Sequence, residues 1–315
     1  MKAVILDLES LEDLDLSLVR AEVDALDSYR VTKPDQVAER IKDYDVVITN
    51  KVVLSAEQIK AALNLKLICI VATGTNNVDL EAASRAGVKV CNCVAYGVDS
   101  VVQHVFSLML ALHTQLISYD RAVKAGDWGQ SEQFCMLSFP IRELAGKTLG
   151  IVGYGNLGAA VAKVAVAFGM KVILAQRPGA APQAGRLPMQ EFLAELDVLS
   201  LHCPLTDSTR DLIDAKALAR MKPGAMLINA ARGGVVNEQA LADALRSGHL
   251  AGAATDVLTE EPPVKGNALL MDDIPNLIIT PHSAWGSREA RERIIGQTVE
   301  NIQGVKAGER VRQVN

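Results

Sequence analysis

Short apolar runs alternate with helix-like stretches along nearly the whole chain. Four runs lie in the first part, KAVILDL, DVVITN, LKLICIVATG and VKVCNC, and segments such as SAEQIKAALN between them carry apolar residues at helical spacing. The pattern restarts at Lys147 with six further runs: KTLGIVGYG, KVILAQR, VLSLHCP, AMLINAA, AGAATDV and NLIITPH. Strands that alternate with helices pair in parallel and are covered by the helices. The sequence therefore predicts an α/β protein with two doubly wound parallel sheets.

The length of the chain also favours two domains, because a single core rarely grows beyond about 250–300 residues and this chain has 315. Ser100-Val-Val-Gln103 has the spacing of a helix-capping box. It predicts the start of an apolar-rich helix that continues to about Tyr119. After the helix comes a stretch with no clear period, AGDWGQSEQFCMLSFP. The helix-like run SREARERIIGQTVENIQGV follows the last strand, so we expect it to pack back on the first domain. We therefore place a first domain at 1–97 plus 285–315 and a second at 98–284.

Composition and charge argue against several classes of protein. Acidic residues outnumber basic ones by 37 to 32, and the net charge of −5 argues against a nucleic-acid binder. No apolar stretch approaches the roughly 20 residues of a membrane-spanning helix, and the N-terminal run is too short for a secretory signal. We therefore expect a cytoplasmic protein with no membrane partner. Cys91 and Cys93, two of five cysteines, are expected on one face of a packed strand, and no metal site is predicted.

A glycine-rich turn marks the start of the second series of strands. Gly153-Tyr-Gly155-Asn-Leu-Gly158 follows the apolar run LGIV and precedes the helix-like segment AAVAKVAVAFG. In such a turn the first glycine permits the tight bend, the second lets the backbone approach a pyrophosphate, and the third allows the helix to pack closely on the strand. The N–H groups at the start of the helix then face the phosphates. The turn therefore predicts a dinucleotide site, the alternative being an ordinary glycine-rich turn.

The end of the next strand bears on which dinucleotide is bound. An acidic residue that binds the ribose hydroxyls is usual about 20 residues beyond the turn, but no Asp or Glu occurs from Ala159 to Gln190. The strand KVILA ends instead in Gln176-Arg177-Pro178. Gln176 removes the repulsion that a carboxylate would exert on a 2′-phosphate, and Arg177 offers that phosphate a charge-assisted hydrogen bond. We expect NADP as the preferred cofactor, with NAD as the alternative if Arg177 is merely solvated.

Polar residues follow several later strands of the second series. They lie in His202-Cys203-Pro204, in Ala230-Ala231-Arg232-Gly233-Gly234, and at Asp256 and His282. Ligands of doubly wound sheets bind outside the carboxyl ends of the strands. We therefore expect Arg232, Asp256 and His282 to line one crevice, although each alone also has a structural explanation, such as a solvated arginine or a histidine that satisfies a core hydrogen bond.

With these motifs the chain resembles the NAD(P)-dependent D-2-hydroxyacid dehydrogenases over essentially its full length. The segments that carry the resemblance are VATGTNNVDL, GYGNLG, LHCPLTDSTRDLI, MKPGAMLINAARGGVVNEQAL, AATDVLTEEPP and IITPHSAW. The resemblance implies that Arg232, Glu261 and His282 form the catalytic set. It also implies that Thr73 and Gly74 offer backbone N–H groups to a substrate carboxylate. The resemblance further implies a substrate domain at 1–97 plus 285–315 and a dinucleotide-binding domain at 98–284, both Rossmann-like, with a cleft between them.

The resemblance and the motifs together define a larger set of expected site residues. The expected cofactor residues are Gly153, Gly155, Asn156, Leu157, Gly158, Gln176, Arg177, His202, Cys203, Pro204, Thr209, Ala230, Ala231, Arg232, Asp256 and His282. Asp256 is expected at the nicotinamide end. The expected substrate residues are Thr73, Gly74, Arg232, His282 and Trp285, of which Trp285 either walls the substrate pocket or packs as a core aromatic. Arg232 would hold the carboxylate and polarise the carbonyl, and His282, oriented by Glu261, would supply a proton.

The segments YGVDSVVQHVFSLML and PHSAWGSREARER resemble the glycerate dehydrogenase and hydroxypyruvate (glyoxylate) reductase branch. The expected activity is hydride transfer between NAD(P)H and a small 2-keto acid, most simply hydroxypyruvate or glyoxylate. Phosphite oxidation, another D-2-hydroxyacid dehydrogenase activity and a non-catalytic, dinucleotide-sensing corepressor are the alternatives. The resemblance further implies a homodimer, whose contact lies in the dinucleotide domain and in the stretch from Tyr119 to Pro140.

Overall fold

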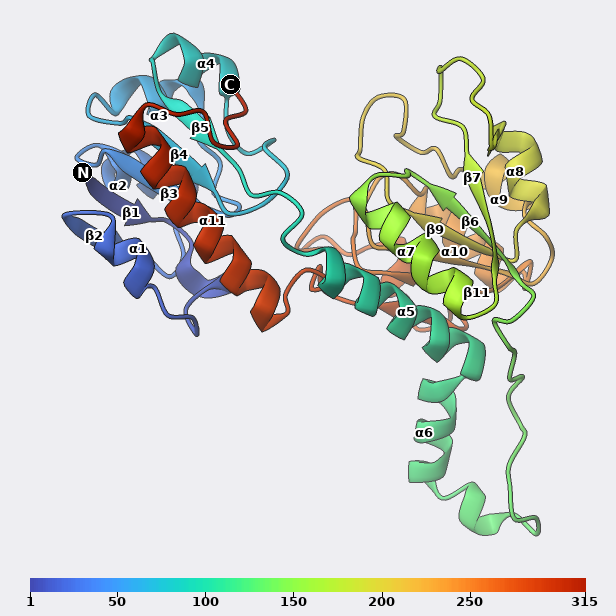
Figure 1. The fold of residues 1–315 in the computed structure, drawn as a ribbon. Coiled ribbons are helices and arrows are strands. Elements are labelled where there is room, and N and C mark those ends of the chain that lie inside the picture. Colours follow the sequence, from blue (N-terminus) through green and yellow to red (C-terminus); the bar gives the residue numbers. More distant parts are fainter. The chain divides into compact units, whose positions relative to one another are not determined.

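The computed structural model describes residues 1–315, which fall into two compact units (Figure 1). Unit 1 consists of Met1–Gly97 and Gly286–Asn315, and unit 2 consists of Val98–Trp285. The boundaries expected from the sequence differ from these only at Trp285, which belongs to unit 2.

Unit 1 is built on a parallel sheet of five strands in the order β2-β1-β3-β4-β5. The strands are β1 (Lys2–Ile5), β2 (Ala25–Ser28), β3 (Val46–Thr49), β4 (Leu67–Ile70) and β5 (Lys89–Cys91). The helices between them are α1 (Ser17–Ala21), α2 (Val37–Ile41), α3 (Ala56–Ala61) and α4 (Leu80–Arg85). Every residue of β3 and β4 is buried, because helices cover both faces of a parallel sheet. The edge strand β2 was not among the four predicted runs, since its sequence ALDS is short and half exposed.

The C-terminal helix α11 (Arg288–Ala307) belongs to unit 1, as expected from the run that follows the last strand. Ser287 caps its start by accepting a hydrogen bond from the N–H of Ala290, and Gly308 ends it in a left-handed conformation with φ +76°. Arg291 on α11 pairs with Asp13, which follows β1 in the chain. The chain therefore begins and ends in the same unit.

Unit 2 is built on a parallel sheet of seven strands in the order β12-β11-β10-β9-β6-β7-β8. Its strands are β6 (Thr148–Val152), β7 (Lys171–Ala175), β8 (Arg186–Leu187), β9 (Val198–Leu201), β10 (Ala225–Asn229), β11 (Leu250–Thr255) and β12 (Leu277–Ile279). Its helices are α5 (Val98–Thr114), α6 (Leu116–Ala125), α7 (Asn156–Ala167), α8 (Met189–Glu195), α9 (Ala215–Arg220) and α10 (Glu238–Arg246). The prediction of six strands is wrong by one, because β8 spans only two residues at the sheet edge. The chain order reverses at β6, where doubly wound sheets bind ligands.

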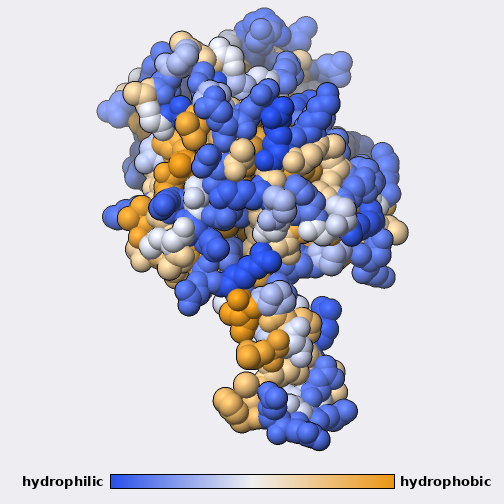
Figure 2. Space-filling view, turned by 90° about the vertical axis from the view of Figure 1, so that its right-hand side faces the viewer, coloured by the Kyte–Doolittle hydropathy of each residue, from blue (hydrophilic) through white to orange (hydrophobic).

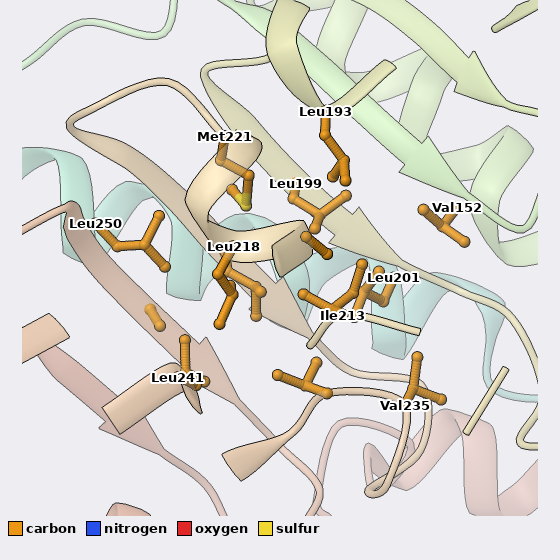
Figure 3. Packing of buried hydrophobic residues seen from close by; sticks show 14 of the residues in the cluster. Val152, Leu193, Leu199, Leu201, Ile213, Leu218, Met221, Val235, Leu241 and Leu250 are labelled. Atoms are coloured by element: carbon orange, nitrogen blue, oxygen red, sulfur yellow. The ribbon is translucent and has the colours of Figure 1, made fainter. Parts of the chain in front are cut away.

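Aliphatic side chains fill both faces of the unit 2 sheet. On one face, Leu199 and Leu201 of β9 meet Leu218 of α9 and Leu241 of α10, as Figure 3 shows. On the other face, α5 and α7 pack against β6 and β10 through a second cluster that includes Val105, Met109 and Val161. Both clusters hold the strands rigidly, so residues at the strand ends have defined positions.

Helix α5 begins at Val98, so the predicted capping box at Ser100 is wrong. Ser100 lies inside the helix, and its hydroxyl donates to the carbonyl of Ala284 instead, at 2.6 Å. The predicted single helix to Tyr119 is also wrong, because Gln115 adopts φ +54° and separates α5 from α6. No single helix has the length and apolar composition needed to cross a membrane; only α5 and α6 together, across their 57° bend, reach those values.

Helix α6 and the chain that follows it extend away from the sheet of unit 2 (Figure 1). This segment, residues 116–141, is called the arm below. Apolar side chains are visible on its surface in Figure 2, and its exposed large apolar residues are Leu116, Ile117, Val123, Trp128, Phe134, Leu137 and Ile141. Tyr119 anchors the returning chain, since its hydroxyl donates to the carbonyl of Phe139 at 2.7 Å.

Candidate active site

The glycine turn after β6 has the space that a dinucleotide requires. A Cβ on Gly153, whose φ is +92°, would lie 2.6 Å from the backbone of His202, and one on Gly158 would lie 2.1 Å from the carbonyl oxygen of Gly153. These two glycines therefore let β6, β9 and α7 approach closely. A Cβ on Gly155 would meet nothing within 4 Å, so open space lies beside the start of α7. The N–H groups at this helix start face that space, where an anion is stabilised.

His202, which follows β9, carries a buried nitrogen with no partner in the protein. Its Nε2 lies 2.8 Å from the hydroxyl of Ser200, whereas its Nδ1 is buried without a hydrogen bond. Burial lowers the pKa of His202 to about 4, so the ring is neutral near pH 7. An unpaired buried polar atom costs about 1–3 kcal/mol, which a bound group that reached it would offset. This atom and the open glycine turn both fit a dinucleotide.

The segment after β7 forms a turn with Arg177 exposed in it. The amide of Gln176 donates to the carbonyl of Ala180 at 2.7 Å, and the N–H of Ala180 donates to the carbonyl of Arg177. The guanidinium of Arg177 makes no hydrogen bond or ion pair within the protein. The Gln176 side-chain amide therefore shapes the turn, a role that the sequence did not suggest.

A second arginine, Arg186 on β8, lies beside the glycine turn. Its guanidinium donates to the carbonyl of Ala175 at 3.3 Å and stands 5.9 Å from the centre of the Tyr154 ring, between Gly153 and Gly155 in the chain. No carboxylate pairs with it. Arg186 was not among the expected site residues, because the two-residue strand that carries it is too short to recognise in the sequence.

His282, which follows β12, forms a close ion pair with Glu261. The Nδ1 of His282 lies 2.6 Å from a carboxylate oxygen of Glu261, and about a quarter of the His282 side chain is exposed. The other oxygen of Glu261 accepts the N–H of Leu258 at 2.8 Å. Because Glu261 is fixed in this way, it orients the imidazole and leaves Nε2 as the atom that can exchange a proton with a ligand.

Arg232 lies in the loop after β10, and Asn229 organises that loop. The side chain of Asn229 is buried; it accepts the N–H of Ala231 and donates to the carbonyl of Arg232. A Cβ on Gly233 would lie 1.9 Å from the carbonyl oxygen of Leu258, so this loop packs directly on the segment that holds Glu261. Arg232 is exposed, and its guanidinium donates one hydrogen bond, to the carbonyl of Ala231. Most of its donors are therefore available to an anionic ligand.

Asp256, at the end of β11, is 1 % exposed and holds the turn that carries His282. Its carboxylate accepts the N–H groups of Ser283 and Ala284, both at 2.9 Å, and the hydroxyl of Thr280 at 2.5 Å. Its carbonyl accepts the N–H of His282 at 2.7 Å. The carboxylate thus holds the turn that carries His282. This structural role is additional to the contact with the nicotinamide that we expected from the sequence.

The remaining expected residues occupy varied positions. Thr209 is buried and donates to the carbonyl of Pro204, so it shapes the turn after His202. Trp285 is partly buried and packs against the second apolar cluster, the one formed by α5 and α7. Thr73 and Gly74 lie in unit 1, after β4, where Asn92 donates to the carbonyl of Thr73. Cys203 and Ala231 are buried, whereas Asn156 and Pro204 are exposed.

Residues 106–284 match the family model for the D-isomer specific 2-hydroxyacid dehydrogenase, NAD binding domain. The chain belongs to the D-isomer specific 2-hydroxyacid dehydrogenase family. It is therefore an oxidoreductase acting on CH–OH donors and binds a nicotinamide dinucleotide.

The dehydrogenase is similar to named relatives over most of its length. It is 44% identical to the glycerate dehydrogenase of Methylorubrum extorquens over 275 residues, 87% of each chain. It is 36% identical to the hydroxypyruvate reductase of Blautia hydrogenotrophica, with both chains fully covered. Among solved structures, an acyclic imino acid reductase in complex with NADPH and D-Arg matches with a TM-score of 0.87 at 28% identity, over all of both chains. The predicted fold class and family are confirmed.

Replacing Glu261 with glutamine tests the pair in this dehydrogenase. We expect kcat for reduction of a 2-keto acid to fall, because the imidazole of His282 loses the anionic partner that holds it while it donates a proton. Steady-state rates measure the change. Glu260→Gln, at the neighbouring exposed carboxylate, is the control. An unchanged kcat would mean that the charge of Glu261 does not assist His282.

Proposed function

We propose that this dehydrogenase reduces hydroxypyruvate, or a closely related small 2-keto acid, to the D-2-hydroxy acid. The observation that carries the proposal is the His282–Glu261 pair, 2.6 Å apart, on a segment that packs against the Arg232 loop. A proton donor and an exposed guanidinium are the two groups that reduction of a 2-keto acid needs. The relatives named glycerate dehydrogenase and hydroxypyruvate reductase support the choice of substrate.

Each residue has a distinct part in the proposed reaction. The guanidinium of Arg232 holds the substrate carboxylate in a planar, bidentate pair and polarises the carbonyl. His282 donates a proton from Nε2 to the carbonyl oxygen in reduction and accepts it back in oxidation. Glu261 keeps the ring in the orientation that presents Nε2. The nicotinamide, when bound, supplies or accepts the hydride.

A panel of 2-keto acids tests the substrate. We expect the highest kcat/KM with hydroxypyruvate or glyoxylate, and lower values as the side chain grows, when the loss of reduced cofactor is followed at 340 nm. Phosphite with oxidised cofactor belongs in the panel, because phosphite oxidation is the alternative reaction. A preference for phosphite, or for a bulky 2-keto acid, would contradict the proposed substrate.

We propose NADPH as the preferred cofactor, with NADH as the weaker one. Two guanidiniums, Arg177 and Arg186, flank the end of β7, and neither has a carboxylate partner. A carboxylate at position 176 would repel a 2′-phosphate, and Gln176 instead shapes the Arg177 turn. An unpaired arginine beside a phosphate forms a charge-assisted hydrogen bond that is roughly twice as strong as a neutral one.

The double variant Gln176→Asp, Arg177→Ala is expected to turn the preference toward NADH. A charge-assisted hydrogen bond contributes about 1.5–3 kcal/mol, so its loss and the new repulsion should change the ratio of kcat/KM values by at least about tenfold. The ratio of NADPH to NADH efficiency, measured with one 2-keto acid, gives the result. Arg220→Ala, on the exposed end of α9, is the control. If the wild type uses NADH as well as NADPH, Arg177 is solvated and the proposed preference is wrong.

We propose that the protein is a homodimer whose contact includes the arm. Phe134 is 91 % exposed and Leu137 is 75 % exposed, although both are large and apolar. Apolar surface gathered on one segment is typical of an interaction site. A second copy of the chain is the partner expected from the family resemblance. A cytoplasmic location stays a prediction.

Light scattering tests the dimer. The wild type should have about twice the mass of the 33.7 kDa chain, and Phe134→Asp with Leu137→Asp should halve that mass, because two charges would then be buried in the contact. Leu63→Asp, at an exposed leucine of unit 1, should leave the mass unchanged. A monomeric wild type at micromolar concentration would refute the proposal.

A further inference from the structure

A histidine that is not among the expected site residues, His104, lies beside the turn that carries His282. His104 projects from α5, and its Nε2 lies 3.0 Å from the hydroxyl of Thr280 and 3.5 Å from the carboxylate of Asp256. About a fifth of its side chain is exposed. His104 thus contacts the ends of both β11 and β12.

The hydrogen bonds in this group have one consistent direction. A carboxylate only accepts, and Asp256 already accepts two backbone N–H groups, so the hydroxyl proton of Thr280 is directed at Asp256. The oxygen of Thr280 can then only accept from His104. Nε2 of His104 therefore carries a proton. The three residues form a series of two hydrogen bonds, from His104 to Thr280 and from Thr280 to Asp256.

The carboxylate of Asp256 in turn fixes the backbone that follows His282. Its two oxygens hold the N–H groups of Ser283 and Ala284, the two residues after His282. His282 has φ +53°, a left-handed conformation that is uncommon for residues other than glycine and needs support from its surroundings. Ser100, one helical turn before His104 on α5, donates to the carbonyl of Ala284. Helix α5 therefore holds the turn at two points.

We propose that His104 is a positioning residue for the catalytic histidine. Through Thr280 it orients the buried carboxylate of Asp256, which fixes the turn and thereby the imidazole of His282 against Glu261. The catalytic consequence rests on the proposed function, because it requires that His282 transfers a proton. The structural consequence, a fixed His282 ring, does not require it.

Two matched pairs of variants test the hydrogen bonds from His104 through Thr280 to Asp256. His104→Leu and Thr280→Val remove a hydrogen-bonding group at nearly constant size, whereas His104→Gln and Thr280→Ser keep one. We expect the first two to lower kcat by about 10- to 100-fold, as a small displacement of a catalytic group does, with KM for the 2-keto acid changed less than about threefold. The two conservative variants should stay within about threefold of the wild type.

The pathway through Thr280 and the chemical step are tested separately. His104→Leu combined with Thr280→Val should lose no more activity than either single variant, because both substitutions break the same series of hydrogen bonds. The deuterium isotope effect on kcat with 4-deuterated reduced cofactor should rise in both single variants, since a misplaced His282 slows the chemical step. A merely structural role would lower the unfolding temperature and leave kcat and the isotope effect unchanged.

Histidine-ring NMR gives a readout that does not depend on activity. With ¹⁵N-labelled histidine, the Nδ1 signal of His282, assigned by His282→Gln, should shift in His104→Leu and Thr280→Val but not in His104→Gln and Thr280→Ser. If the wild type reduces no 2-keto acid, the proposed function fails and this signal alone decides the positioning role. An unchanged signal in both disruptive variants, or an active wild type whose kcat they do not alter, would overturn the inference. Should His104→Leu not fold, the Thr280 pair decides it in the same way.

Discussion

His282→Ala is expected to lower kcat for 2-keto acid reduction by about 10²–10⁴-fold, the usual contribution of a positioned general acid. Its Nδ1 is held by Glu261 at 2.6 Å, so Nε2 is the nitrogen available to the substrate. Binding of the reduced cofactor should change little, because the glycine turn and the β7 end lie at other strands of the sheet. Stopped-flow turnover and a fluorescence titration of the cofactor measure the two quantities.

The control for this variant is His249→Ala. His249 is part-buried in unit 2, contacts the carbonyl of Leu218, and precedes β11, at the opposite end of that strand from Asp256. It should keep wild-type turnover. If His282→Ala retains more than about a tenth of the wild-type kcat, His282 is not the proton donor.

Arg232→Lys is expected to lower kcat/KM by about 10²–10³-fold. Lysine keeps the positive charge but replaces a planar fork with a point charge, so the bidentate pair with a carboxylate and the polarisation of the carbonyl are both weakened. The guanidinium of Arg232 donates one hydrogen bond inside the protein, to the carbonyl of Ala231, which leaves its other donors for the ligand.

An arginine-to-lysine substitution outside the site is the control for Arg232→Lys. Arg220→Lys, in the last turn of α9, should keep wild-type kinetics. A wild-type kcat/KM for Arg232→Lys would show that charge alone is enough, and the proposed bidentate contact would then be wrong.

The positions of the main site residues followed from local patterns in the sequence. The glycine turn, Arg232, Asp256 and His282 each come directly after an apolar run, and the carboxyl ends of parallel strands share one edge of a sheet. Such placement needs no knowledge of tertiary contacts. The pairing of Glu261 with His282 came from the family resemblance, and the structure forms that hydrogen bond.

Other features depend on contacts between residues that are distant in the chain. His104 and Thr280 are 176 residues apart, so no local pattern indicates that they meet. The capping prediction at Ser100 failed for a similar reason, because its hydroxyl bonds to Ala284, 184 residues away. The short strands β2 and β8 were missed because four- and two-residue edge strands carry too few apolar residues to form a recognisable run.

Chiral analysis of the product tests the central claim most directly. Wild-type protein, incubated with hydroxypyruvate and reduced cofactor until the cofactor is consumed, should yield D-glycerate in an amount equal to the cofactor oxidised. His282→Ala protein under the same conditions should form little product. L-glycerate as the product, or no oxidation of either NADPH or NADH above the His282→Ala level, would contradict the account.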